Sequence, residues 1–146
     1  ESSDAYHITA PHPQGRGAID AMQRALARAG IEPRDVHHVN AHGTGTRLND
    51  IAEARAIEQV FGKELPVVST KGYTGHTLGA AGATEAIMSL FALLEGWIPP
   101  SVGAAPVDEE VNVLIATEKM DIKPKRVLSN SFAFGGNNTA VLLRAA

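Results

Sequence analysis

One stretch near the middle of the chain limits most strongly what the chain can fold into. Residues 66–70 are rich in β-branched side chains, residues 71–79 form a glycine-rich loop that carries Lys71 and His76, and an apolar run follows. This order predicts a strand, a loop at its carboxyl end and then a helix. Open α/β sheets place their functional residues on such loops. We therefore expect an α/β fold with chemistry at Lys71 and His76.

The helix predicted after this loop carries a single formal charge. Between Gly72 and Leu94 the only charged side chain is Glu85. A helix that is apolar on nearly all of its faces is expected to be buried. Burying a carboxylate is costly unless the group is paired or protonated. Glu85 therefore needs a partner, and Lys71 and His76 are the nearest candidates in the sequence.

The rest of the chain repeats the order of strand, loop and helix. A second helix is expected to begin at Asn49 or Asp50, and residues 1–14 to be irregular. The other patterns predict a helix over residues 15–29 that ends at Gly30, and strands over 36–41, 111–116, 126–132 and 139–144. Alternating helices and strands followed by several strands indicate a mixed sheet covered by helices. We expect one domain over residues 1–146.

Composition gives no indication of several classes of partner. The chain has 13 Lys and Arg against 16 Asp and Glu, a net charge of −3, and its basic residues are scattered. This pattern does not favour a nucleic acid or an anionic membrane as a partner. The apolar run of residues 72–94 is interrupted by Gly, Thr and Glu, there is no signal-peptide pattern, and there is no cysteine. We expect a cytoplasmic protein, and the start at Glu1 suggests a fragment or a processed piece.

Three glycine-rich loops follow predicted strands, at residues 42–46, 71–82 and 130–138. Glycines let backbone N–H groups approach a ligand closely, and histidine is suited to proton transfer and hydrogen bonding near neutral pH. His42 and His76 lie at equivalent strand-to-helix junctions, which favours a shared function for them with an acyl or carbonyl substrate. The remaining histidines are interpreted as structural or surface residues: His7, His12, His37 and His38.

Other residues allow two interpretations. Asp50 and Glu53 are either acids of the first helical turn or supports of the site, and the sequence leaves both open. Phe132 and Phe134 alternate as core residues of a strand do. No phosphate-binding loop or dinucleotide fingerprint is present. A metal site is not expected either, because neighbouring histidines on a strand point to opposite faces.

Three linked motifs carry a family resemblance. The sequences NAHGTGT at residues 40–46, STK and GHTLGAAG within residues 69–82, and NSFAFGG at residues 130–136 are similar in order and spacing to the β-ketoacyl-acyl carrier protein synthases. These are the elongating, type II condensing enzymes of fatty acid and polyketide synthesis. The resemblance covers nearly the whole chain. It implies a thiolase-like fold made of two similar α/β halves, with this chain as the C-terminal half.

The resemblance also implies a reaction, a decarboxylative Claisen condensation. An acyl group is held as a thioester on a cysteine, malonyl on acyl carrier protein loses CO₂, and the resulting carbanion attacks the acyl carbon. His42 and His76 match the family's catalytic histidines and Lys71 its lysine, and the pair of Lys71 with Glu85 is expected to orient His76. No cofactor is implied. Phe134 matches the family's gating phenylalanine, and Phe132 and Gly135 are expected in the same gating and oxyanion-hole loop. The further residues expected to support the site are Thr44, Thr46, Asp50 and Glu53.

One departure from the family changes what this chain can do. The family's nucleophilic cysteine belongs to the N-terminal half, and residues 1–146 contain no cysteine. The expected partners are therefore the N-terminal half of the same enzyme, acyl carrier protein and a second copy in a homodimer. The alternative is a non-catalytic subunit that resembles a chain-length factor. A thiolase acting on coenzyme A esters is disfavoured, because thiolases carry a cysteine near their C-terminal motif.

Overall fold

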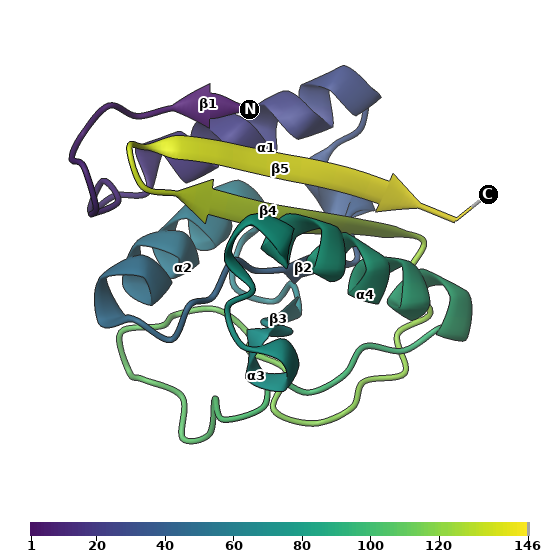
Figure 1. Ribbon diagram of the computed structural model, residues 1–146. Coiled ribbons are helices and arrows are strands. Elements are labelled where there is room, and N and C mark those ends of the chain that lie inside the picture. Colours follow the sequence, from purple (N-terminus) through teal and green to yellow (C-terminus); the bar gives the residue numbers. More distant parts are fainter. Residues whose placement is uncertain (146) are drawn as a thin grey trace.

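The computed structural model describes residues 1–145 and contains one five-stranded sheet (Figure 1). Two short 3-10 turns, η1 (Pro33–Asp35) and η2 (Leu78–Ala80), precede β2 and α4. The strands and helices in chain order are β1 (Ser2–Ser3), α1 (Arg16–Ala29), β2 (His38–Asn40), α2 (Arg47–Phe61), β3 (Val67–Val68), α3 (Lys71–Thr74), α4 (Ala81–Glu95), β4 (Arg126–Ala133) and β5 (Asn137–Arg144).

The sheet is mixed, as the sequence predicts. Its strand order is β1-β5-β4-β2-β3, with β2 parallel to both β3 and β4, and β5 antiparallel to β4 and β1. Asn40 lies between Val68 of β3 and Ser129 of β4. The carboxyl ends of these parallel strands therefore meet at one edge of the sheet, where open α/β sheets bind their ligands.

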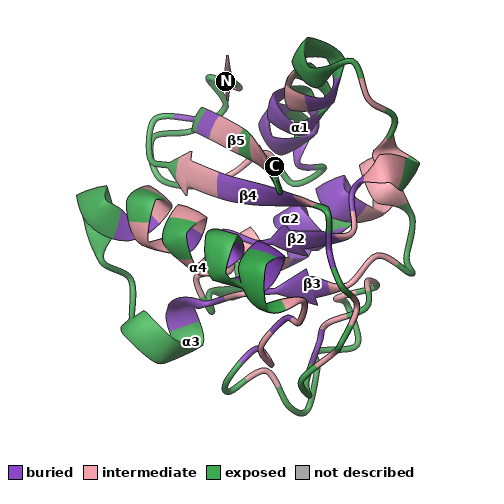
Figure 2. Ribbon diagram, turned by 90° about the vertical axis from the view of Figure 1, so that its right-hand side faces the viewer, coloured by how far each residue is buried: buried purple, intermediate pink, exposed green. Residues whose placement is uncertain are grey.

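Helices cover both faces of the sheet. The neighbouring side chains Val67 and Val68 point to opposite faces, and each belongs to a different core cluster. On the face of α1 and α2 the main core contains Ile19, Met22, Leu26, Val39, Ile57, Val67 and Leu128. On the face of α4 a smaller core contains Val68, Ala92, Ile98 and Ala116. Figure 2 shows the buried side of α4 turned toward the strands.

The prediction that α4 is buried on nearly all faces is wrong for this chain. Its buried residues are Ala81, Glu85, Ser89, Ala92 and Leu93, whereas Ile87 is 54% exposed, Phe91 55% and Leu94 79%. The sheet covers only one face of the helix, so the opposite apolar face lies open (Figure 2). By length and composition the stretch Leu78–Glu95 could also cross a membrane. In this structure α4 packs along β4, and its own residue Glu85 is buried.

Several predicted boundaries also change. The strand expected over residues 111–116 does not form: Ile115 makes only an isolated bridge with Val67, because β3 is two residues long and offers little edge for pairing. Helix α2 begins at Arg47 after Thr46, rather than at Asn49 or Asp50, since Thr46 is the last residue with extended backbone angles. The strand predicted over residues 36–41 is reduced to β2. The irregular N-terminal region contains β1.

His38 is a core residue rather than a hydrogen-bonded or surface one. It is 2% exposed, in the middle of the sheet, and within residues 1–145 neither of its ring nitrogens has a hydrogen-bond partner. It shares the face of Asn40, whose side chain contacts α4. Burial lowers the pKa of His38 from 6.5 to about 4, so the folded protein holds this ring neutral.

We expect His38 to weaken the fold in acid. Between pH 6.5 and about 4 the unfolded chain binds a proton at His38 that the folded chain does not, so stability is full above this window and falls as the pH drops through it. As the pH falls from 6.5 to about 4, the free energy of unfolding of the parent should drop by about 3 kcal/mol more than that of a His38→Phe variant. Urea titrations at a series of pH values measure this, with the exposed His7→Phe as control. Parallel pH curves for parent and His38→Phe would contradict the expectation.

Candidate active site

The two histidines singled out from the sequence come together at the carboxyl edge of the sheet. His42 follows β2 and His76 follows α3, and their ring centroids lie 5.3 Å apart with an interplanar angle of 84°. His42 is 6% exposed, whereas His76 is exposed in this chain. Two imidazoles from separate strand-to-helix crossovers thus face one small region of space.

Hydrogen-bond partners assign which nitrogen carries the proton in the neutral form of each ring. The backbone N–H of Leu78 donates to Nδ1 of His76 over 3.2 Å, and Leu78 holds this position with a φ of 52°. Nζ of Lys71 lies 3.3 Å from Nδ1 of His42, and an ammonium group can only donate. Both Nδ1 atoms are therefore acceptors, and both rings carry their proton on Nε2.

The charge state of His42 is set by its surroundings. Burial lowers the pKa of His42 to about 3, and the electrostatic influence of the neighbouring Lys71 and His76 acts in the same direction. The ring is consequently neutral at physiological pH. A neutral ring with Nδ1 engaged offers its Nε2–H as a hydrogen-bond donor.

Lys71 and Glu85 form the buried ion pair that the sequence predicts. Their side chains are 6% and 3% exposed, and the ammonium contacts both a carboxylate oxygen of Glu85 and the carbonyl oxygen of His42. Burial raises the pKa of Glu85. The expectation that this pair orients His76 is not met by the contacts, because β3 runs beside β2 and delivers Lys71 to the His42 loop.

Glu53 is a support of the site rather than a cap of its helix. Its buried carboxylate accepts hydrogen bonds from the backbone N–H of His42 (2.9 Å) and of Gly43 (2.8 Å), and from Nδ2 of Asn130 (3.0 Å). Burial raises its pKa. Asp50, in contrast, is the acid of the first turn of α2, and the hydrogen bond it accepts comes from Asn49. Glu53 therefore joins β4 to the loop that carries His42.

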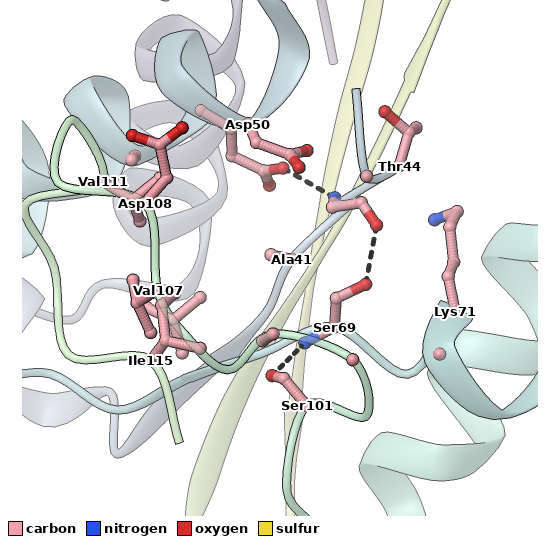
Figure 3. A pocket seen from close by; sticks show the side chains of 18 of the residues that line it. Ala41, Thr44, Asp50, Ser69, Lys71, Ser101, Val107, Asp108, Val111 and Ile115 are labelled. Carbon is pink, nitrogen blue, oxygen red and sulfur yellow. Dashed lines mark hydrogen bonds between the residues drawn. The ribbon is translucent and has the colours of Figure 1, made fainter. Parts of the chain in front are cut away.

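Two serines brace the same loop from the other side. The hydroxyl of Ser69 donates to the carbonyl of Gly43 over 2.8 Å, and the backbone N–H of Ser69 donates to the hydroxyl of Ser101 over 3.0 Å (Figure 3). No local pattern in the amino-acid sequence marks Ser101 as a site residue, because its role depends on its contact with Ser69, which lies 32 positions away in the chain. Together with Glu53, these bonds hold the backbone of residues 42–43 on both sides.

Two buried asparagines also support the site, and the sequence analysis did not propose them as site residues. Asn40 donates to the carbonyl oxygen of Glu85 (3.1 Å) and to the hydroxyl of Ser89 (3.2 Å), which attaches β2 to α4. Asn130 contacts Glu53, as described above. Asn40 lies within a strand between the apolar residues Val39 and Ala41, and this pattern was the available signal, because a buried amide needs hydrogen-bond partners. Asn130 lies between Ser129 and Ser131, so its sequence neighbours gave no such signal.

The remaining predicted residues take different positions. The ring of Phe132 lies 5.5 Å from that of His42, whereas Phe134 is 75% exposed at the turn between β4 and β5. The backbone N–H of Gly135 donates to the carbonyl oxygen of Ile8 over 2.7 Å, so this N–H already has a hydrogen-bond acceptor within the chain. The hydroxyls of Thr44 and Thr46 are 2.8 Å apart on the exposed side of the His42 loop.

A cavity of about 560 Å³ opens beside these groups, and Lys71, His76, Gly43 and Thr44 are among the residues that line it. Figure 3 shows Lys71 and Thr44 on the same side of the cavity. Within residues 1–145 there is no cluster of three or more His, Cys, Asp or Glu side chains arranged to hold a metal ion. The arrangement can donate two imidazole N–H groups to an oxygen that gains negative charge.

Comparison with known proteins identifies relatives of this chain. It is 44% identical over 147 residues to the 3-oxoacyl-[acyl-carrier-protein] synthase 2 of Staphylococcus aureus, and 44% identical over 143 residues to the chloroplastic 3-oxoacyl-[acyl-carrier-protein] synthase II of Arabidopsis thaliana. These alignments cover 98% and 95% of this chain but 36% and 26% of the relatives. The chain thus spans about a third of the length of the bacterial relative.

The structure gives the same result. A ketosynthase from Xenorhabdus doucetiae, solved in complex with its chain length factor, superimposes with a TM-score of 0.89 at 45% identity, over 99% of this chain and 37% of that one. The thiolase-like α/β fold implied by the resemblance is confirmed. Residues 1–105 match the family described as beta-ketoacyl synthase, C-terminal domain. The chain therefore belongs to the β-ketoacyl synthase family and contains a part of the ketosynthase C-terminal half.

Proposed function

We propose that this chain supplies the two-histidine half of an active site that catalyses decarboxylative Claisen condensation of an acyl thioester with malonyl-acyl carrier protein. The observation that supports this most directly is the pair of rings at 5.3 Å, each with Nδ1 engaged by another group. We assign the two Nε2–H groups left by these contacts as the donors to one substrate oxygen. The names of the relatives point to the same substrate class.

The chemistry requires such donors. When the bond between the malonyl methylene carbon and its carboxylate breaks, CO₂ leaves and the electron pair remains as an enolate on the thioester. The enolate oxygen then accepts N–H bonds from His42 and His76, each worth about 3 kcal/mol in a preorganised site. The enolate carbon next attacks the carbonyl carbon of the acyl thioester, and the thiolate leaves. Lys71 would keep the Nδ1 side of His42 engaged throughout.

The thiolate in this scheme must come from elsewhere. The chain contains no cysteine. We assign the nucleophile to the N-terminal half of the same enzyme, and propose that this half packs on the exposed apolar face of α4, formed by Ile87, Leu90, Phe91 and Leu94. An exposed apolar surface of this kind is typical of an interface. Acyl carrier protein and a second copy of the enzyme are the other proposed partners, and the proposed location is the cytoplasm.

The proposal predicts that residues 1–146 alone form no acyl-enzyme. Incubation with a radiolabelled acyl thioester should leave this chain unlabelled, because no side chain can form the thioester, whereas the full-length enzyme should be labelled in its N-terminal half. The full-length enzyme should also release one CO₂ for each 3-oxoacyl product. Covalent labelling of the isolated chain would contradict the assignment. A full-length enzyme that is never acylated would favour the non-catalytic subunit instead.

A further inference from the structure

A second cavity, of about 510 Å³, is lined by three arginines. Arg28 belongs to the last turn of α1, Arg126 begins β4 and Arg144 ends β5. The cavity therefore lies at the end of the sheet opposite the two histidines, because β4 starts beside the start of the parallel strand β2, and His42 follows the end of β2. The other described residues that line it are apolar, and none is Asp or Glu: Ala25, Ala29, Ile31, Ala140 and Leu142.

The register of the sheet brings two of these arginines together. Arg126 lies directly opposite Arg144 in the antiparallel pair of β4 and β5. Side chains paired in this way share one face of the sheet, with Cβ atoms about 4.5–5.5 Å apart, and like charges there destabilise the pair. Leu128 and Leu142, two residues along each strand, are also paired and belong to the core beneath α1. Both arginines therefore lie on the α1 face, where Arg28 joins them.

These three charges are not balanced within the part of the chain that the structure describes. Within residues 1–145, none of the three arginines forms an ion pair with a carboxylate. Arg24, one turn earlier on α1, is paired with Asp20. A guanidinium stays charged in proteins, so the repulsion cannot be relieved by loss of a proton. An anion bound between the arginines would offset it.

We propose that this arginine cavity binds the phosphate group of a small molecule. A phosphate group carries up to two negative charges and three strong acceptor oxygens, which suits several guanidinium groups, whereas one guanidinium already satisfies a carboxylate. The volume of about 510 Å³ falls within the roughly 300 to 1,000 Å³ typical of small-molecule sites and leaves room for an organic group against the apolar lining. The site is independent of the condensation. It also lies on the α1 face, away from the face of α4 assigned to the N-terminal half (Figure 2).

The test is calorimetric titration of the full-length enzyme that contains this chain, in phosphate-free buffer of low ionic strength. The probes are inorganic pyrophosphate and adenosine diphosphate, and tighter binding of the second indicates an organic phosphate ester as the natural ligand. Arg126→Gln and Arg144→Gln should each raise Kd at least about tenfold, the usual effect of losing a hydrogen bond to a charged group. The matched control is Lys125→Gln, which removes an exposed charge next to Arg126 but outside the cavity, and its Kd should stay within about twofold of the parent. Equal weakening in Lys125→Gln, or no binding of either probe by the parent, would overturn the inference.

A second measurement separates a binding role from a structural one. Without a probe, Arg144→Gln should be at least as stable to urea as the parent, because the substitution removes the repulsion with Arg126. Saturating pyrophosphate should raise the Tm of the parent, since a ligand that binds only the folded state stabilises it, but not that of Arg144→Gln. A variant that is less stable than the parent and gains the same Tm shift from pyrophosphate would overturn the inference. So would a parent that binds a glutamate-rich peptide but neither phosphate probe, because the arginines would then serve a protein partner.

Discussion

Replacing His42 or His76 with alanine in the full-length enzyme is expected to lower the rate of malonyl-acyl carrier protein decarboxylation by roughly 10²–10³-fold for each histidine. This is the usual effect of removing one donor from a preorganised oxyanion site. Both rings hold their proton on Nε2, because Nδ1 of each is engaged by Lys71 or by Leu78. Each substitution therefore removes one N–H that the enolate oxygen needs.

The measurement is release of labelled CO₂ from carboxyl-labelled malonyl-acyl carrier protein. His37→Ala is a suitable control, since His37 precedes β2 at the end opposite His42, and its rate should stay within about twofold of the parent. Because burial lowers the pKa of His42 to about 3, the contribution of this ring should persist at pH 5, where an ordinary histidine would be protonated. Undiminished CO₂ release in both alanine variants would refute the assignment.

Replacing Lys71 with methionine is expected to lower the free energy of unfolding by about 3–5 kcal/mol. The substitution leaves the carboxylate of Glu85 buried without its ammonium partner, and breaking a buried pair on one side carries a penalty of this size. Protonation of Glu85, whose pKa burial already raises, should reduce the penalty as the pH falls. Urea unfolding at neutral and acidic pH measures both effects.

A double variant and an exposed pair provide the controls. Lys71→Met combined with Glu85→Gln should recover much of the lost stability, because the second change removes the unpaired charge. Arg24 and Asp20 form a pair on α1 whose side chains are 61% and 53% exposed, and Arg24→Met should cost less than about 1 kcal/mol. If Lys71→Met costs no more than Arg24→Met, Lys71 and Glu85 do not act as a buried pair.

Part of the site could be predicted because the chemistry is encoded locally. His42 and His76 each follow a short β-branched segment and precede a helix, so the parallel order of β2 and β3 brings their loops to one edge. The pairing of Lys71 with Glu85 followed from a single charge in an apolar helix, which burial makes costly. Neither inference needed knowledge of contacts between distant segments.

Other features depend on contacts that no local pattern specifies. From the sequence, Glu53 could equally be an acid of the first helical turn or a support of the site. The structure distinguishes these, because α2 lies beside the His42 loop and the carboxylate of Glu53 accepts hydrogen bonds from two backbone N–H groups there. Ser101 becomes relevant only when its segment lies beside Ser69. The exposed face of α4 also escaped prediction, because hydrophobicity indicates that a surface needs a partner but not which segment provides it.

The sequence by itself determined the class of fold, the strand-to-helix junctions that carry the histidines, and the need for a cation near Glu85, since these follow from side-chain period and the cost of burying charge. The tertiary structure alone decided that Lys71 supports His42 rather than His76, and that both rings carry their proton on Nε2. The physical reason is that proton positions and pKa values depend on atoms a few ångströms away, and only the packing of distant segments sets those distances.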